Sequence, residues 1–307
     1  MACKNCLEKP VIKLQNNNVS LCKKCFIEYF EKKVKKTITD YKLIRKNENI
    51  VVACSGGKDS TVLLYLIKKI TSNRRDIKIT ALAIDEGIHG YRNKSLEFLK
   101  DFCNKQEVEL NIYSYKEEFT KSLDEILKTY KGIPCSICGV LRRYLLNKKS
   151  KELKATKLAT GHNLDDEAQT ITMNYFKNNV KMSARLGPIA GIIRDKGFIP
   201  RIKPLYFLTE KEVASYAFLK GFMDKFNECP NSPLSYRAQI RDTLNELENK
   251  YPGTKNGIIS SFIEILPLLK EKYKNDHEVI KSCKICDEPS SQDICKSCYY
   301  IETVIKA

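Results

Sequence analysis

The sequence contains no apolar run that approaches the ~20 residues needed to cross a membrane as a helix. No apolar signal core follows its MACKNC start, so we expect a cytoplasmic protein. No long low-complexity tract interrupts it. Hydrophobic residues make up 42% and charged residues 30%, a balance too apolar for an intrinsically disordered chain. The 307 residues are enough for one α/β catalytic domain with small satellite modules.

Acidic residues are few beside basic ones: 37 Asp and Glu face 54 Lys and Arg, a net charge of +17. Excess positive charge bears on partners and not on fold, and nucleic acid is the natural polyanionic partner. The alternative is an AT-rich genome that encodes Lys at any polar position, which the many Lys, Asn and Ile residues also fit. Charge alone therefore favours nucleic acid without deciding for it.

Cysteine is abundant, with 13 residues, of which ten fall in CxxC pairs. In a reducing compartment such cysteines are more often metal ligands or catalytic thiols than disulfides. Two paired CxxC knuckles lie at each end of the chain, and four thiolates close a tetrahedral structural zinc site. We therefore predict two zinc fingers, with a redox CxxC or an iron-only rubredoxin-like site as alternatives. The predicted ligands are Cys3, Cys6, Cys22 and Cys25, and Cys283, Cys286, Cys295 and Cys298.

Between the knuckles the chain alternates buried strands with helices. Such a rhythm indicates an α/β fold, a parallel sheet with helices on both faces, whose ligands bind beyond the carboxyl ends of the strands. Later residues have a helical pattern, beginning with a capping box at Thr209 and Glu212 and continuing through an amphipathic helix that ends near Pro252. The predicted strands are residues 50–55, 77–85, 110–115 and 158–161, and the first helices begin near Asp59 and span 95–104.

A glycine turn joins the first strand to the first helix. Its residues are Ser55, Gly56, Gly57, Lys58, Asp59 and Ser60. The glycines allow a tight turn that aims N–H groups at an anion, and the helix N-terminus adds its dipole. The Walker A spacing is absent, and the hexapeptide matches the pyrophosphatase loop, or PP-loop, of enzymes that split ATP between its α and β phosphates.

Five cysteines remain after the predicted zinc ligands. Cys54 and Cys103 lie in apolar surroundings and are predicted to be core residues. Cys135, Cys138 and Cys229 make a trio, and three thiolates hold a cubane cluster with one iron left open for sulfide. The same cysteines also fit a persulfide and disulfide scheme, or a zinc site with a missing ligand. Cys229 favours the cluster, because the disulfide scheme has no need of it.

These motifs together resemble the tRNA 2-thiouridine synthetase family, of the TtuA/NcsA type. The resemblance rests on the SGGKDS loop, the GHNLDDEA run from Gly161 to Ala168, the Cys135–Cys138 pair and the flanking knuckles. It covers nearly the whole chain, and the terminal knuckles separate this family from the 2-thiocytidine enzymes. The family includes enzymes that act on the T-loop uridine and the cytosolic wobble-uridine thiolases, and its fold is that of the adenine nucleotide alpha hydrolases.

The resemblance implies site residues and cofactors. A 4Fe–4S cluster is implied at the cysteine trio, and ATP, Mg²⁺ and two Zn²⁺ complete the cofactors. The implied catalytic residues are the cysteine trio, Asp59, Arg142 and Asp166. Because Arg stays protonated, Arg142 is expected to neutralise charge on the phosphates or in the transition state. Asp165 and Glu167 fit helix N-terminal charges equally well, and His162 fits a packed strand-end residue. The implied nucleotide contacts are Ala53, Ser55, Gly56, Gly57, Lys58, Asp59, Ser60, Ile84, Gly161 and Asp166.

The expected reaction has two steps. The uridine C2 oxygen attacks the α phosphate and pyrophosphate leaves; sulfide held on the cluster then attacks C2 and AMP leaves. The wobble position is favoured, with the T-loop uridine as the alternative. The tRNA backbone is expected on the zinc modules and the basic helices near 220–275, with Arg237 and Arg241 as candidates that fit solvated surface charge as well. A homodimer and the sulfur donor, free sulfide or a ubiquitin-like carrier, are left open.

Two other functions fit parts of the pattern. Another ATP-dependent ligase on this fold, such as an amidotransferase or a lysidine-type enzyme, needs no cysteine trio. A non-enzymatic zinc-finger RNA-binding protein needs no ATP. The predicted domains are a zinc finger at 1–30, the catalytic domain at 31–215, a helical tRNA-binding region at 216–277 and a second zinc finger at 278–307.

Overall fold

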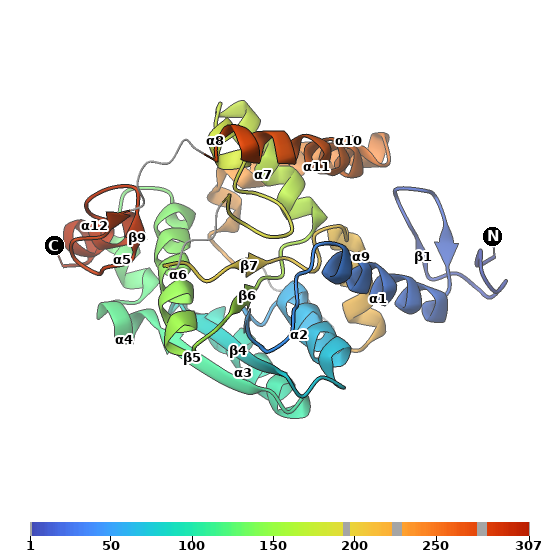
Figure 1. Ribbon diagram of the computed structural model, residues 1–307, viewed down its shortest axis with the longest axis horizontal. Coiled ribbons are helices and arrows are strands. Elements are labelled where there is room, and N and C mark those ends of the chain that lie inside the picture. Colours follow the sequence, from blue (N-terminus) through green and yellow to red (C-terminus); the bar gives the residue numbers. More distant parts are fainter. Residues whose placement is uncertain (1, 193–196, 223–228, 275–280, 307) are drawn as a thin grey trace.

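A computed structural model describes residues 2–192, 197–222, 229–274 and 281–306. Its centre is a five-stranded, all-parallel sheet in the order β5-β4-β3-β6-β7 (Figure 1). The predicted parallel α/β fold is therefore confirmed. The strands are β3 (Glu48–Ala53), β4 (Ile77–Asp85), β5 (Glu109–Ser114), β6 (Lys157–Ala159) and β7 (Arg201–Ile202).

The four predicted strands are all present, with small differences at their ends. β4 has the predicted bounds, whereas β3 ends at Ala53, so the prediction that it continues to Ser55 is wrong. β7 was not predicted, because a strand of two residues leaves no periodic pattern. The predicted helices are confirmed as α2 (Lys58–Thr71), α3 (Arg92–Lys105) and α10 (Tyr236–Lys250), and the predicted capping box opens α9 (Glu210–Leu219).

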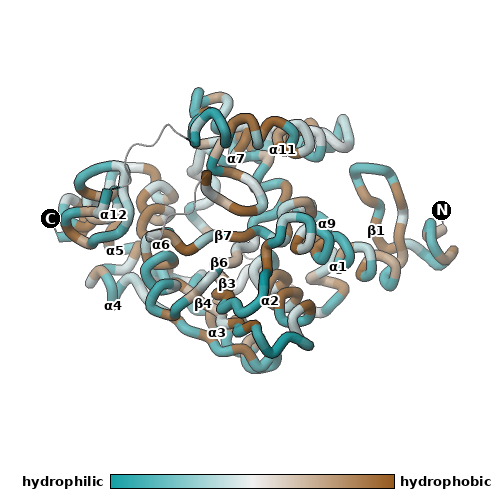
Figure 2. Tube along the Cα trace, in the orientation of Figure 1, coloured by the Kyte–Doolittle hydropathy of each residue, from teal (hydrophilic) through white to brown (hydrophobic). Residues whose placement is uncertain are grey.

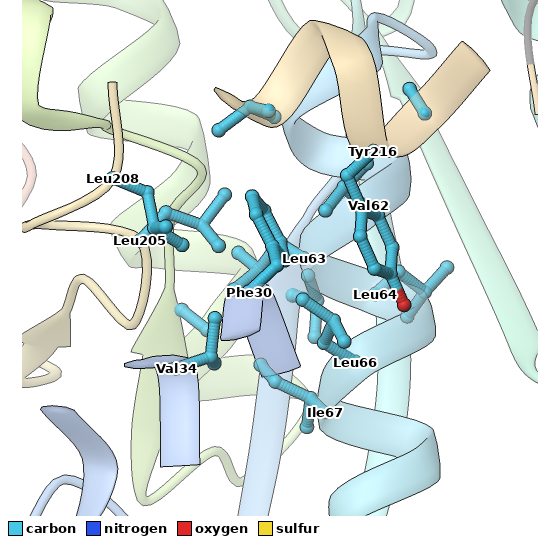
Figure 3. Packing of buried hydrophobic residues seen from close by; sticks show 14 of the residues in the cluster. Phe30, Val34, Val62, Leu63, Leu64, Leu66, Ile67, Leu205, Leu208 and Tyr216 are labelled. Atoms are coloured by element: carbon cyan, nitrogen blue, oxygen red, sulfur yellow. The ribbon is translucent and has the colours of Figure 1, made fainter. Parts of the chain in front are cut away.

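Neighbouring residues of each strand face opposite layers, as a sheet buried on both faces requires. Ile50 and Val52 of β3 pack in one apolar core with α2, α3, α9 and α1 (Lys23–Asp40). In that core, Phe30 and Tyr216 stack with ring centroids 4.3 Å apart beside Leu63 (Figure 3). Val51 faces the second core, formed with α4 (Tyr115–Phe119), α5 (Leu123–Thr129) and α6 (Pro134–Glu152).

Further helices form a third core beside the sheet. They are α7 (Leu164–Phe176), α10 and α11 (Thr254–Lys272). The short α8 (Val180–Ser183) lies against α7 and α11, and η1 (Ser232–Leu234) precedes α10. Figure 1 shows them grouped above the sheet, and Figure 2 shows an apolar, brown stretch on α11 there. Within the described residues, no helix is long and apolar enough to span a membrane.

The two cysteine modules lie at opposite ends of the long axis of the molecule (Figure 1). The first has the hairpin β1 (Ile12–Lys13) and β2 (Ser20–Leu21) and runs directly into α1, which crosses the predicted boundary at residue 30. The second has β8 (Lys281–Ser282), β9 (Pro289–Ser290), α12 (Lys296–Tyr300) and η2 (Ile301–Ile305). The predicted boundary at residue 277 lies outside the described residues.

The order of the strands marks where a ligand belongs. From β3 the chain passes outward through β4 to β5, and then returns to place β6 on the other side of β3. The connections after β3 and β6 therefore diverge, and ligands of such sheets bind in the crevice at this switch point. The loop at residues 55–60 and the run from Gly161 are the connections that leave these two strand ends.

Candidate active site

The first turn of α2 points its backbone N–H groups toward the carboxyl end of β3. Gly57 is the N-cap residue and offers no side-chain cap. Gly56 has φ +78°, and a Cβ there would lie 2.2 Å from the carbonyl oxygen of Ser95, so only glycine fits. An open helix N-terminus with its positive dipole end suits a phosphate group.

Hydroxyl groups brace this loop from within. The Ser55 backbone N–H donates to Ser60 Oγ at 3.1 Å, and Ser60 Oγ donates to the Gly57 carbonyl at 3.0 Å. Ser55 Oγ in turn accepts from the Gly57 N–H at 3.3 Å. Ser55 and Ser60, both predicted to contact the nucleotide, therefore form hydrogen bonds within the loop. These bonds fix the shape in which the loop presents its N–H groups.

Lys58 lies at the loop beside two carboxylates. Its Nζ is 3.3 Å from Asp59 Oδ2 and 2.7 Å from Glu210 Oε1 on α9. Burial by itself would lower the pKa of Lys58, but these carboxylates together raise the pKa above its ordinary value. The loop therefore keeps a permanent positive charge next to its N–H groups.

The second strand end lies directly against the loop. A Cβ at Gly161 would be 3.0 Å from the backbone carbon of Asp59 and the backbone nitrogen of Ser60, so the glycine permits a close approach. Asn163 Nδ2 donates to Asp59 Oδ1 at 3.0 Å. The PP-loop and the GHNLDDEA run, far apart in the sequence, therefore form one site.

Asp166 faces this site from the first turn of α7. Its Oδ2 accepts from the Asn163 backbone N–H at 3.2 Å, and Asn163 Oδ1 accepts from the Asp166 N–H at 3.2 Å, which closes a capping box. Burial and the negative charge of Asp59 raise the pKa of Asp166 to about 7. Two carboxylates that repel each other beside a phosphate loop are a donor set that a hard divalent cation fits.

The neighbouring acids in the run have other partners. Asp165 accepts from Lys255 Nζ of α11 through Oδ1 and from the Glu210 N–H at 2.7 Å through Oδ2. Glu167 Oε1 lies 2.7 Å from Lys203 Nζ, and both residues are buried. Asp165 and Glu167 lie at the N-terminus of α7, as expected. Their side chains also join α7 to α11, to α9 and to the residue that follows β7.

The cysteine trio gathers at the start of α6. The loop through Gly132 precedes the helix as predicted, and Cys135 and Cys138 lie among the first five residues of the helix. Cys135 Sγ is 3.5 Å from the Asn231 carbonyl, two residues beyond Cys229. Burial raises the pKa of the Cys135 thiol, and the nearby Cys229 raises it further. Cys229 packs against the second core, of which Cys138 is a member. The three predicted residues are brought together from two distant segments.

A buried carboxylate connects the trio to the loop. Glu86, just after β4, lies 2.9 Å from Arg92 Nε and 3.5 Å from Arg142 Nε. Arg142 Nη2 in turn lies 3.6 Å from Cys138 Sγ, one helical turn away as predicted. Arg92 Nη1 donates to the Ser55 carbonyl. A continuous chain of contacts therefore runs from the nucleotide loop to a cysteine thiol.

Sequence reasoning missed Glu86 and Arg92, whereas Ile84 and Ala53 were named as strand-end contacts. Ile84 is buried near the end of β4, and its carbonyl accepts from Arg92 Nε at 3.0 Å. Ala53 is half-buried at the matching end of β3. A usable signal existed: Glu86 follows a parallel strand at its carboxyl end, where polar residues serve ligands.

The remaining predicted residues have mixed outcomes. Cys54 and Cys103 are buried in the same core, so their predicted packing role is confirmed. His162 is exposed, with Nδ1 2.9 Å from Thr160 Oγ1, so the interpretation as a packed histidine is wrong.

The two candidate tRNA arginines on α10 have different surroundings. Arg237 donates to the Asp166 carbonyl at 3.2 Å and to Thr170 Oγ1 at 2.9 Å, so it faces the α7 end of the site. Arg241 Nε lies 3.1 Å from Asp242 Oδ1 of its own helix. Arg237 therefore belongs to the candidate site, whereas Arg241 pairs with an acid of its own helix.

Each terminal module gathers its four cysteines into a group whose ligand atoms all lie within 4.8 Å of one another. The sulfur atoms of Cys6 and Cys22 are 3.4 Å apart, and those of Cys286 and Cys295 are 3.7 Å apart. Zn–S bonds of about 2.3 Å place the sulfurs of a tetrahedral site about 3.8 Å apart. Both groups can therefore hold a metal ion, and their spacing fits zinc.

The trio is spaced more widely, since its three sulfurs do not all lie within 4.8 Å of one another. A single tetrahedral ion held by all three thiolates is a poor fit to that spacing.

Residues 27–248 match the model of the PP-loop domain family. This match agrees with the strand order and the glycine loop, which together define a nucleotide-binding enzyme of the PP-loop class. The chain is 40% identical over 300 residues to the tRNA-5-methyluridine(54) 2-sulfurtransferase of Pyrococcus horikoshii, covering 98% of this chain and 93% of that one. It is 39% identical over 306 residues to the cytoplasmic tRNA 2-thiolation protein 1 of Danio rerio, covering 98% and 87%.

A solved structure is similar over the whole chain. The U34-tRNA thiolase NcsA from Methanococcus maripaludis with its [4Fe-4S] cluster superposes with a TM-score of 0.83 at 34% identity, covering 99% of this chain and 96% of that one. The chain belongs to the tRNA 2-thiouridine synthetase family of PP-loop proteins. The predicted family is thereby confirmed.

Proposed function

We propose that this protein is an ATP-dependent sulfurtransferase that converts a uridine of tRNA into 2-thiouridine. The observation that carries the proposal is the contact chain from the Ser55 carbonyl through Arg92, Glu86 and Arg142 to Cys138. Direct contacts join the candidate nucleotide loop to a cysteine thiol, which supports adenylation followed by sulfur insertion. The sulfurtransferase and thiolation names of the relatives support it.

The loop residues serve the first step. The uridine C2 oxygen attacks the α phosphorus of ATP, the bond to the β phosphate breaks, and pyrophosphate leaves. The N–H groups of the first turn of α2 and the Lys58 ammonium neutralise the charge that develops on the phosphates. Asp59 and Asp166 would hold Mg²⁺, which would supply positive charge to the phosphates.

The thiol site serves the second step. A sulfur nucleophile attacks C2, the bond from C2 to the adenylated oxygen breaks, and AMP leaves. Cys135, Cys138 and Cys229 would hold a 4Fe–4S cluster, which would supply iron as a carrier for sulfide. Arg142, which Glu86 holds in place, would keep a positive charge beside Cys138. The two terminal cysteine groups would each hold Zn²⁺ as a structural ion.

The target position has two candidates. We favour the wobble uridine, because the similar solved structure is named a U34-tRNA thiolase. The uridine at position 54 is the second candidate, because the Pyrococcus relative is named for it. The name of the Danio relative supports a cytoplasmic location. Free sulfide or a ubiquitin-like carrier would supply sulfur.

The test is a reconstituted reaction with unmodified tRNA, ATP, Mg²⁺ and sulfide, under anaerobic conditions, followed by mass spectrometry of nucleosides and of mapped fragments. We expect 2-thiouridine at the wobble position, AMP formation in equal amount, and no product from a Cys229→Ala variant. Product at position 54 would replace the favoured target by the second candidate.

The same experiment separates the rival functions. An amidotransferase or lysidine-type ligase would form AMP without thiouridine and would keep its activity in Cys229→Ala. A non-enzymatic RNA-binding protein would bind tRNA without consuming ATP. Either result would refute sulfur transfer.

A further inference from the structure

Two arginines lie side by side on the α6 face of the sheet, next to the thiol site. Arg201 opens β7 and pairs in register with Leu158, whose side chain packs beneath α6 in the second core. Arg201 Nη2 donates to the Arg143 carbonyl of α6 at 3.3 Å. The Arg143 guanidinium folds back over Gly139, where a Cβ would meet its Nη1 at 3.2 Å. Gly139 is the residue after Cys138, so the pair borders the cysteine trio.

The charges of this pair are not neutralised by neighbouring acids. Arg142 has Glu86 as its partner, and Arg237 has Asp166 at 3.9 Å. Within the described part of the chain, no carboxylate lies within 4 Å of Arg143 or Arg201. Partial burial and the Arg143 charge lower the pKa of Arg201 to about 10. Both groups stay charged at neutral pH, so they repel each other until an anion binds.

We infer that Arg143 and Arg201 form a subsite for a backbone phosphate of the RNA substrate, an inference that rests on the proposed function. Guanidinium groups bind phosphate through paired N–H donors, and such contacts position a nucleic acid without reading its sequence. ATP has candidate donors of its own in Lys58 and the first turn of α2.

The location of the pair identifies which phosphate it would bind. The C2 atom of the target base must come to the cysteine trio to receive sulfur. A base carries its phosphate at the far side of its own ribose, within one nucleotide's length. Because Arg143 and Arg201 border the trio, they lie where the phosphate of a base extruded from its loop would arrive.

The test compares Arg143→Gln, Arg201→Gln and Arg201→Lys with Arg75→Gln. Arg75 is exposed just before β4, at the amino end of the sheet and so away from the site, and its change removes the same charge. The affinity for unmodified tRNA is measured by fluorescence anisotropy over a range of salt concentrations. The affinity for a non-hydrolysable ATP analogue and for pyrophosphate is measured separately by calorimetry.

We expect each Gln variant to weaken tRNA binding about tenfold at low salt. The slope of log K against log salt should fall by about one, as expected for one lost phosphate contact. Arg201→Lys should recover part of the affinity. Arg75→Gln should bind tRNA like the unchanged protein, and the affinity for the ATP analogue should be unaffected throughout. Thermal melting checks that each variant is folded. If Arg201→Gln does not fold, Arg201→Lys is used in its place.

Three outcomes would overturn the inference. Weaker binding of the ATP analogue or of pyrophosphate with unchanged tRNA binding would assign the pair to the nucleotide. An equal loss of tRNA affinity in Arg75→Gln would show that the effect comes from net charge alone. Unchanged tRNA binding in the Gln variants would remove the subsite while leaving the proposed function in place, whereas an unchanged protein that binds no tRNA would refute the proposed function itself.

Discussion

Replacing Glu86 by Gln tests whether the buried carboxylate couples the loop to the thiol site. The Glu86 side chain is 6% exposed and holds two guanidinium groups. Gln keeps the size and one acceptor oxygen but removes the charge. Arg92 keeps its bonds to the Ser55 and Ile84 carbonyls, so the loop should hold its shape. Arg142 keeps only its contact with the Cys138 thiol and should lose its position.

The expected loss follows from the bonds that change. Hydrogen bonds to charged groups contribute roughly 1.5–3 kcal/mol. If one such contribution is lost in the transition state, kcat falls roughly 10- to 100-fold. KM for ATP should change less than about threefold, because the Arg92 contacts to the loop remain. The measurement is steady-state thiouridine formation with varied ATP, beside thermal melting of each variant.

Glu212→Gln is the matched control. Its side chain is also 6% exposed and lies 3.5 Å from Lys33, away from the thiols. We expect a comparable drop in melting temperature with kcat nearly unchanged. Combining Glu86→Gln with Arg142→Gln should cost no more activity than Arg142→Gln alone, since Glu86 acts through Arg142. Additive losses, or equal kcat for the Glu86 and Glu212 variants, would refute the coupling.

Three further predictions follow from single contacts. Gly56→Ala should abolish ATP binding in calorimetry, because its Cβ would lie 2.2 Å from a carbonyl oxygen, whereas Gly90→Ala, with φ +71° but nothing within 4 Å, should keep it. Lys255→Met should lower the free energy of unfolding by about 3–5 kcal/mol in urea titrations, since it strips Asp165 of its buried partner; Lys274→Met, 59% exposed, should change it little. A strong zinc chelator should release two zinc ions per chain, counted with a colorimetric dye, and lower the melting temperature; release of none would contradict the zinc assignment.

The sheet and loop were predictable because their signals are local. Continuous β-branched runs mark strands that are buried on both faces, and the break at Gly56 marks a turn that only glycine can make. The spacing of the terminal CxxC pairs likewise predicts two groups that the structure brings within metal-binding distance. Each of these features depends on residues close together in the chain.

The partners of acidic residues were not predictable. Glu86 is defined by Arg92 and Arg142, which come from two different helices. Asp165 and Asp166 are the same residue type in adjacent positions, and only the packing of α11 decides which of them has a lysine partner. Propensity and spacing contain no information about such contacts, because they depend on how distant elements pack.

The different surroundings of these two aspartates have a mechanistic consequence. Successive residues of a helix point about 100° apart, so Asp166 faces Asp59 at the loop while Asp165 faces Lys255 of α11. One helical turn therefore carries both a candidate metal ligand and the anchor of the helices expected to contact RNA. Loss of the Lys255 pair should disturb the backbone that presents Asp166, so Lys255→Met should weaken Mg²⁺-dependent ATP binding even where the protein remains folded. An ATP affinity equal to that of the unchanged protein would show that the anchor and the metal site are independent.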